Sequence, residues 1–333
     1  MRLTCLTTTL LPITVIAFGA AASNASSADT VFPVSVENCG ISTTYAGAPK
    51  RAFTMNQAAT EIMLALGLHD RMVGTAFLDD AILPEFADAY RTIQVRATAY
   101  PSREELLEAR PDFVYAAYPS AFSNEVPGMR ELLQSETGRY LSPSGCERRN
   151  RSSSESTEMV FGEIRDIARI FGVLPRAEQL ISAYRSDLEA TRNQIGTVTT
   201  PARVFWWDSG LPPSVAGCCG IPNEILRLAG AQNIFQDVRG TWGTVSWDDV
   251  IARNPEVIVL VDAAWAPADQ KRQWLLNNAA FAGIDAVKHH RFVTVSFSDA
   301  TPGVRNIGTV RKVARALYPE KFSIGQVQNS TSR

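Results

Sequence analysis

Aromatic and arginine side chains gather where the predicted strands of this chain end, and together they could bind a ligand. Aromatic rings offer rigid faces for stacking, and a guanidinium can hold a carboxylate or phosphate through two parallel hydrogen bonds. The candidates for this chemistry are Phe77, Tyr118, Trp206, Trp207, Trp242, Trp265, Arg239 and Arg305. Trp206 and Trp207 are adjacent on a predicted strand, so we expect only one of them to face the ligand.

Residues suited to catalysis are scarce. A hydrolase would need a nucleophile beside a base, but the chain has no G-x-S-x-G motif and only three histidines, His69, His289 and His290. No C-x-x-C spacing is present, so we expect no metal site. The formal net charge of −2 provides no basic surface for nucleic acid. The sequence therefore favours a binding protein, with a secreted hydrolase as the alternative from another class.

The N-terminus is typical of an export signal. Arg2 precedes an apolar stretch from Leu10 to Ala22, and small residues follow. We expect cleavage of residues 1–28 and a soluble protein secreted to a periplasm or an extracellular space. No cysteine stands at the cleavage point to accept a lipid. The triplets that begin at Asn24, Asn150 and Asn329 would carry glycans only in a eukaryotic source.

Export also makes disulfides possible, and four cysteines follow the signal: Cys39, Cys146, Cys218 and Cys219. Four cysteines allow three pairings. Cys218 and Cys219 are adjacent and could bond only as an eight-membered ring, so their state stays open. Cys39 and Cys146 both fall in the first half of the chain, and we expect a disulfide between them.

A long helix is the element that positions these side chains. From Pro175 to Ile195, apolar or small residues recur at the spacing that forms one stripe along a helix. Pro175 suits its first turn, and Gly196 ends it. About 20 residues span roughly 30 Å, near the width of a small domain. We expect residues 175–197 to bridge two lobes.

An internal repeat on either side of this helix supports two lobes of one architecture. Residues 102–116 and 246–260 each predict a capped helix, a turn at proline and a buried strand, and they align without a gap. Serine aligns with serine, and Glu104 aligns with Asp248.

The order of strands and helices predicts an α/β fold with a Rossmann-like lobe on each side of the bridge. In the first lobe, residues 29–174, the pattern is β-α-β-α-β, which predicts a parallel sheet covered by helices. Residues 198–318 repeat the plan, and residues 319–333 are expected to be a flexible tail. Such lobes bind ligands at the carboxyl ends of their strands.

Three passages now resemble a family. They run from Arg51 to Leu68, from Leu107 to Val114 (Leu-Glu-Ala-Arg-Pro-Asp-Phe-Val) and from Val250 to Val259 (Val-Ile-Ala-Arg-Asn-Pro-Glu-Val-Ile-Val). They are similar to the substrate-binding proteins of ABC importers for iron-siderophores, haem and cobalamin, and the likeness extends from about Val34 to Pro319. The resemblance implies two lobes joined by one rigid helix, with the ligand in the groove between them.

The resemblance also implies the ligand and the partner. The ligand would be a large metal chelate or tetrapyrrole, with no intrinsic cofactor in the protein, and the protein would act as a monomer. One acid on each lobe, Glu104 and Asp248, would dock on an ABC permease. Asp248 stands where the family usually has glutamate, and both acids also suit the first turn of any helix. A free secreted scavenger therefore stays open as the alternative.

Overall fold

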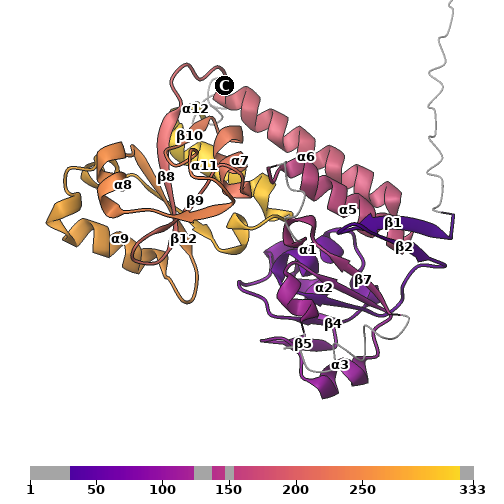
Figure 1. Ribbon diagram of the computed structural model, residues 1–333. Helices are drawn as coiled ribbons and strands as arrows, with labels where there is room; N and C mark the ends of the chain where they lie inside the picture. The colour runs from indigo at the N-terminus through magenta and orange to yellow at the C-terminus, as the bar shows by residue number, and fades with distance from the viewer. Residues whose placement is uncertain (1–30, 124–136, 147–153, 323–333) are drawn as a thin grey trace, which may run out of the picture.

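The computed structural model describes residues 31–123, 137–146 and 154–322 (Figure 1). The expected export signal and the triplets at Asn24, Asn150 and Asn329 lie outside the described residues. Two α/β lobes lie side by side, and one long helix runs along both of them (Figure 1). This arrangement confirms the predicted fold class.

The first lobe is built on a five-stranded sheet whose neighbouring strands are all parallel, in the order β5-β4-β3-β6-β7. A hairpin of β1 (Val34–Asn38) and β2 (Ile41–Tyr45) precedes it. The strands of the sheet are β3 (Ala52–Met55), β4 (Met72–Ala76), β5 (Val95–Ala97), β6 (Phe113–Ala116) and β7 (Gly138–Leu141). The helices are α1 (Gln57–Ala65), α2 (Ala87–Arg91), α3 (Arg103–Ala109) and α5 (Thr157–Phe171).

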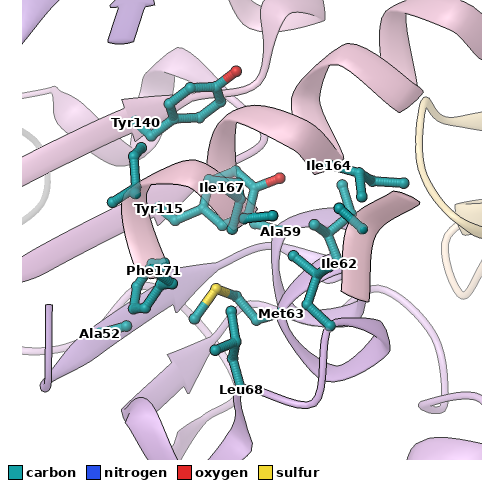
Figure 2. Close-up of a cluster of buried hydrophobic side chains, with 14 of the residues drawn as sticks. Ala52, Ala59, Ile62, Met63, Leu68, Tyr115, Tyr140, Ile164, Ile167 and Phe171 are labelled. Atoms are coloured by element: carbon teal, nitrogen blue, oxygen red, sulfur yellow. The ribbon is translucent and has the colours of Figure 1, made fainter. Parts of the chain in front are cut away.

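Both faces of this sheet are buried, because side chains alternate along each strand. On β6, Phe113 and Tyr115 join a core formed with α1, α5 and α6, whereas Val114 and Ala116 join a second core with α3. Figure 2 shows part of the first core, where side chains of α1 and α5 surround Tyr115. A strand buried on both faces has no side that opens to solvent.

The second lobe contains a mixed sheet. The strand order is β11-β9-β8-β12-β13, and β10 pairs with the start of β8. Strand β9 is antiparallel to both of its neighbours, β8 and β11. The strands are β8 (Ala202–Ser209), β9 (Ser214–Ala216), β10 (Ala231–Asn233), β11 (Trp242–Thr244), β12 (Val257–Asp262) and β13 (Phe292–Ser296). The helices are α7 (Ile221–Leu228), α8 (Trp247–Arg253), α9 (Ala268–Asn277), α10 (Asp285–Lys288) and α11 (Arg305–Leu317).

The bridging helix is α6 (Leu174–Ile195), which confirms the predicted helix. Ala177 and Ile181 are buried in the core of the first lobe, and Ile195 is buried in a core of the second. Gly196 ends the helix at a φ of 70°, which favours glycine. One helix thus contributes to the hydrophobic cores of both lobes.

The repeat is visible as matching local structure. Ser102 and Ser246 each cap a helix with a capping box, and the helices end at Arg110 and Asn254, both in the left-handed conformation. Asp112 accepts hydrogen bonds from the backbone N–H groups of residues 50 and 51, and Glu256 accepts one from residue 203. The two halves of the repeat therefore attach their helices to their sheets in the same way.

Several short elements were not predicted. The pattern of the first lobe missed α2, β5 and β7, and that of the second missed β9, β10 and β11. All six have three to five residues, too few for a hydrophobic period to show. The expected tail also starts too early, because residues 319–322 form α12 (Pro319–Phe322), which packs against α6 and α11.

Candidate functional site

A cavity of about 470 Å³ lies between the two lobes. Its first-lobe wall includes Tyr118 and Glu155, and its second-lobe wall includes Asp208, Trp242 and Phe297. Tyr118 follows β6, Asp208 lies near the end of β8, and Phe297 directly follows β13. The cavity therefore occupies the carboxyl ends of the central strands, where α/β lobes bind ligands.

Two of the predicted aromatic residues, Tyr118 and Trp242, line this cavity from opposite lobes. Trp265 packs edge-on against Phe297, with 4.9 Å between the ring centroids, and its side chain stays largely exposed. Phe77 stacks on Tyr100 at 4.8 Å at the end of β4 and is outside the lining. The cavity thus has aromatic groups on both walls, although a ligand contact for Phe77 or Trp265 stays a prediction.

The prediction that Trp206 or Trp207 faces the ligand is wrong. Trp206 has no exposed surface and belongs to the core beneath α7 and α11, whereas Trp207 packs on the other face of the sheet against Trp247 and Trp274. Helices cover both faces of β8, so alternate side chains enter two different cores. Only the end of this strand reaches the cavity.

Arg305 is not available for a ligand carboxylate either, which corrects its predicted role. Its guanidinium donates to both carboxylate oxygens of Glu61, at 2.8 and 2.6 Å, and to the carbonyl of Ala81 at 2.7 Å. The side chains of Arg305 and Glu61 are 8 % and 1 % exposed. Arg239 is exposed between β10 and β11 and is outside the cavity lining.

The Arg305–Glu61 pair joins the lobes, because Glu61 lies in α1 and Arg305 starts α11. A second contact reinforces it, in which the Asp80 carboxylate accepts a hydrogen bond from the Ser298 N–H at 2.7 Å. Glu61 also accepts hydrogen bonds from the Gln57 side chain and the Leu83 N–H. We name Glu61, Arg305, Asp80 and Ser298 the interlobe latch.

Glu155 forms a further contact between the lobes, in the cavity wall itself. Its carboxylate accepts from the Ile221 N–H at the start of α7, and its own N–H donates to the Cys219 carbonyl, both at 2.9 Å. Glu155 is buried. The Ser- and Arg-rich sequence before it has no hydrophobic period, so nothing in the sequence marked Glu155 as a buried residue.

The adjacent cysteines, whose state the sequence left open, form a disulfide that supports the same wall. Cys218 and Cys219 are bonded to each other between Gly217 and Gly220. A Cβ on Gly217 would lie 2.4 Å from the Gly240 carbonyl oxygen, so only glycine fits there. The backbone N–H groups of residues 217–219 donate hydrogen bonds to carbonyls of the segment 238–241, which leads to Trp242.

The predicted Cys39–Cys146 disulfide is confirmed, with a Cα–Cα distance of 5.2 Å. It ties the β1–β2 turn to the segment after β7, which carries the cavity residue Ser144. The bond thus holds the N-terminal hairpin against the edge of the first lobe.

An aspartate outside the cavity lining, Asp79, affects the lining residue Tyr118 electrostatically. Burial, together with the neighbouring Asp80, raises the pKa of Asp79 to about 6. Burial and the Asp79 charge also raise the pKa of Tyr118 well above its ordinary value, so its hydroxyl stays protonated. Asp79 is half-buried and lies three residues beyond the end of β4.

The two acids of the repeat lie outside the cavity. Glu104 and Asp248 are exposed in the first turns of α3 and α8, on different lobes. Figure 1 shows both helices on the side of the molecule away from α6. Their docking role stays a prediction.

Two negative findings concern residues 31–123, 137–146 and 154–322. Within these ranges, no group of three His, Cys, Asp or Glu side chains could hold a metal ion. The same ranges contain no helix with the length and apolar content that crossing a bilayer requires.

Comparisons with known proteins fit this architecture. A family model described as "Periplasmic binding protein" matches residues 54–298. The uncharacterized ABC transporter substrate-binding lipoprotein YvrC of Bacillus subtilis is 26 % identical over 305 residues, 90 % of each chain. A vitamin B12-binding protein of Vibrio parahaemolyticus is 24 % identical, over 68 % of this chain and 75 % of its own. The crystal structure of a periplasmic binding protein from Veillonella parvula superposes with a TM-score of 0.76 at 31 % identity, covering 86 % of this chain and 97 % of that one.

Proposed function

The chain belongs to the periplasmic binding protein family, and on this basis we propose that it is an exported, monomeric protein that captures a large cofactor-like ligand between its lobes. The observation that carries the proposal is the interlobe cavity, with Tyr118 on one wall and Trp242 on the other. Its volume of about 470 Å³ is in the range of small-molecule binding sites. The family is one of binding proteins, and we propose no catalytic step.

Export is part of the proposal. Residues 1–28 have the composition of a cleaved signal, and disulfides such as Cys39–Cys146 persist in oxidising compartments outside the cytosol. Sequencing the N-terminus of the mature protein tests this directly. A retained segment 1–28 would contradict it.

The ligand class that we propose is an iron-siderophore, a haem or a corrinoid. A conjugated ring could stack on Tyr118 or Trp242, and polar substituents could meet the hydroxyl and carboxyl groups of the wall. The relative from Vibrio parahaemolyticus, named as a vitamin B12-binding protein, supports the corrinoid within this class.

The experiment is a fluorescence titration of the purified protein with haem, cyanocobalamin and a ferric hydroxamate siderophore in parallel. A ligand that enters the cavity should quench the Trp242 emission saturably, because the ring would touch it. Trp206→Phe is the matched control, since Trp206 is buried away from the cavity and its loss should leave the quenching intact. If none of the three compounds binds, the proposed ligand class is wrong.

We propose that the loaded protein then docks on an ABC permease through Glu104 and Asp248. Both carboxylates are exposed, one on each lobe, and the shared helix α6 holds the lobes in one arrangement. Glu104→Ala/Asp248→Ala should keep ligand affinity yet abolish uptake. The double lysine variant should act at least as strongly, because it would place like charges opposite the basic groups that would bind the two acids on the permease. Normal uptake with either variant would favour the free secreted scavenger.

A further inference from the structure

Two exposed aliphatic side chains occupy equivalent positions in the two lobes. Leu107 on α3 and Ile251 on α8 are each five residues beyond their capping serine, and each is 37 % exposed. Resting on the proposed function, we propose that Leu107 and Ile251 form, with Glu104 and Asp248, a paired docking surface for a two-fold symmetric protein. Each half of that partner would present a basic side chain beside an apolar socket.

The residues of each pair are neighbours on their helix. Leu107 follows Glu104 by three positions, and Ile251 follows Asp248 by three, so each aliphatic group lies beside its acid on one helix face. Within the part of the chain that the structure describes, neither acid makes a hydrogen bond or ion pair through its side chain. The helix dipole favours an acid at both positions, but packing within the described part of the chain does not cover the aliphatic group beside either acid.

Some matches between equivalent residues of α3 and α8 have a structural explanation, and others do not. Leu106 and Val250 are both buried in a core, and Glu105 and Asp249 both complete a capping box, so packing and capping explain these matches. The exposed position one residue after the aliphatic group has diverged, from glutamate at 108 to alanine at 252. A single exposed aliphatic residue would need no explanation, but a matched pair beside matched acids does.

The two halves of the surface are held at a fixed separation. In each lobe one arginine, Arg51 or Arg203, donates to carbonyls at the end of the helix and so anchors it to the sheet. Helix α6 and the interlobe latch then fix one lobe against the other. A rigid pair of like patches suits a partner with two like sites, as a two-fold dimer provides.

A lipid surface is the other environment that could cover exposed aliphatic groups. The acids argue against it, because Glu104 and Asp248 would face anionic headgroups. Opposite charges attract across protein interfaces, and an apolar contact beside a charge pair excludes water from it. The chemistry therefore favours a protein with two basic sites.

The test uses Leu107→Ser/Ile251→Ser in the producing strain, in place of the native copy. We expect uptake of the ligand identified by titration to fall roughly tenfold or more, with ligand affinity and melting temperature unchanged. Each single variant should show a partial and similar loss. Ile41→Ser is the matched control, since Ile41 is exposed on the β1–β2 hairpin, and it should leave uptake intact.

Three outcomes would overturn the proposal. If deletion of the protein abolishes uptake, then uptake within twofold of wild type in both the double serine variant and Leu107→Gln/Ile251→Gln would overturn this docking surface but not the proposed delivery function. Normal uptake after deletion would overturn the proposed delivery function as well. Binding of wild type, but not of the double variant, to phosphatidylglycerol vesicles would assign the surface to lipid.

Discussion

The Arg305–Glu61 pair offers the sharpest test of how the lobes are held together. Replacing Arg305 with methionine would leave a carboxylate that is 1 % exposed without its counter-ion, and with only the Gln57 side chain and the Leu83 N–H as donors. Breaking a buried ion pair from one side typically costs about 3 to 5 kcal/mol, because the remaining charge is desolvated and unpaired. We expect the free energy of unfolding to fall by that amount.

Urea denaturation followed by circular dichroism measures this loss, and two further variants define its origin. Arg305→Met/Glu61→Gln removes both charges, so we expect it to recover most of the stability that Arg305→Met loses. Arg185→Met is the matched surface control: Arg185 bonds Glu158 at 2.7 Å, but both side chains are more than half exposed, so it should cost at most about 1 kcal/mol. If Arg305→Met costs no more than Arg185→Met, the latch does not stabilise the protein as argued.

Three other predictions concern the cavity and the disulfide. Trp242→Ala should weaken ligand binding by roughly 1 to 3 kcal/mol in the fluorescence or calorimetric titration, and unchanged affinity would remove Trp242 from the site. Asp79→Asn should raise the melting temperature at about pH 7.5, because Asp79 ionises near pH 6 when folded but near its lower ordinary pKa when unfolded. The gain should shrink as pH falls from about 6 through the ordinary pKa of 3.8, below which both states are protonated, and a pH-independent gain would contradict this cause. Cys39→Ser/Cys146→Ser should lower the free energy of unfolding by about 2 to 5 kcal/mol, since the bond closes a 107-residue separation, and a loss too small to measure by urea denaturation would refute the estimate.

Local patterns in the sequence were sufficient to predict the bridging helix and the two helices of the repeat. The apolar stripe from Pro175 to Ile195 gave the bridging helix to within one residue, because periodicity and terminal Pro and Gly act within the helix itself. The capping serines of the repeat predicted helices α3 and α8 for the same reason. The Cys39–Cys146 bond was also predicted, since both residues lie in one lobe.

The cavity was predicted only in part, because its location and its residues depend on different information. The rule that ligands bind at the carboxyl ends of parallel strands led from the strand before it to Tyr118, which lines the cavity. The same rule failed at Trp206 and Trp207, which lie within the strand and are covered by helices on both faces. The position of a residue on a predicted strand does not show which faces of the sheet will be covered by helices.

Only the tertiary structure decided the contacts between residues far apart in the chain. Arg305 meets Glu61 across 244 positions, and without that contact an arginine near a strand end has the same sequence features as a ligand-binding arginine. Glu155 likewise has no distinguishing feature in the sequence, and its role follows from the hydrogen bond that it accepts from the Ile221 N–H at the start of α7. The sequence by itself determined the helices, the repeat and the two-lobe plan, since these follow from interactions between neighbours along the chain. Which side chains line the interlobe cavity and which hold the lobes together followed from how the two lobes pack, because desolvation and pairing of a charge depend on its partners in space.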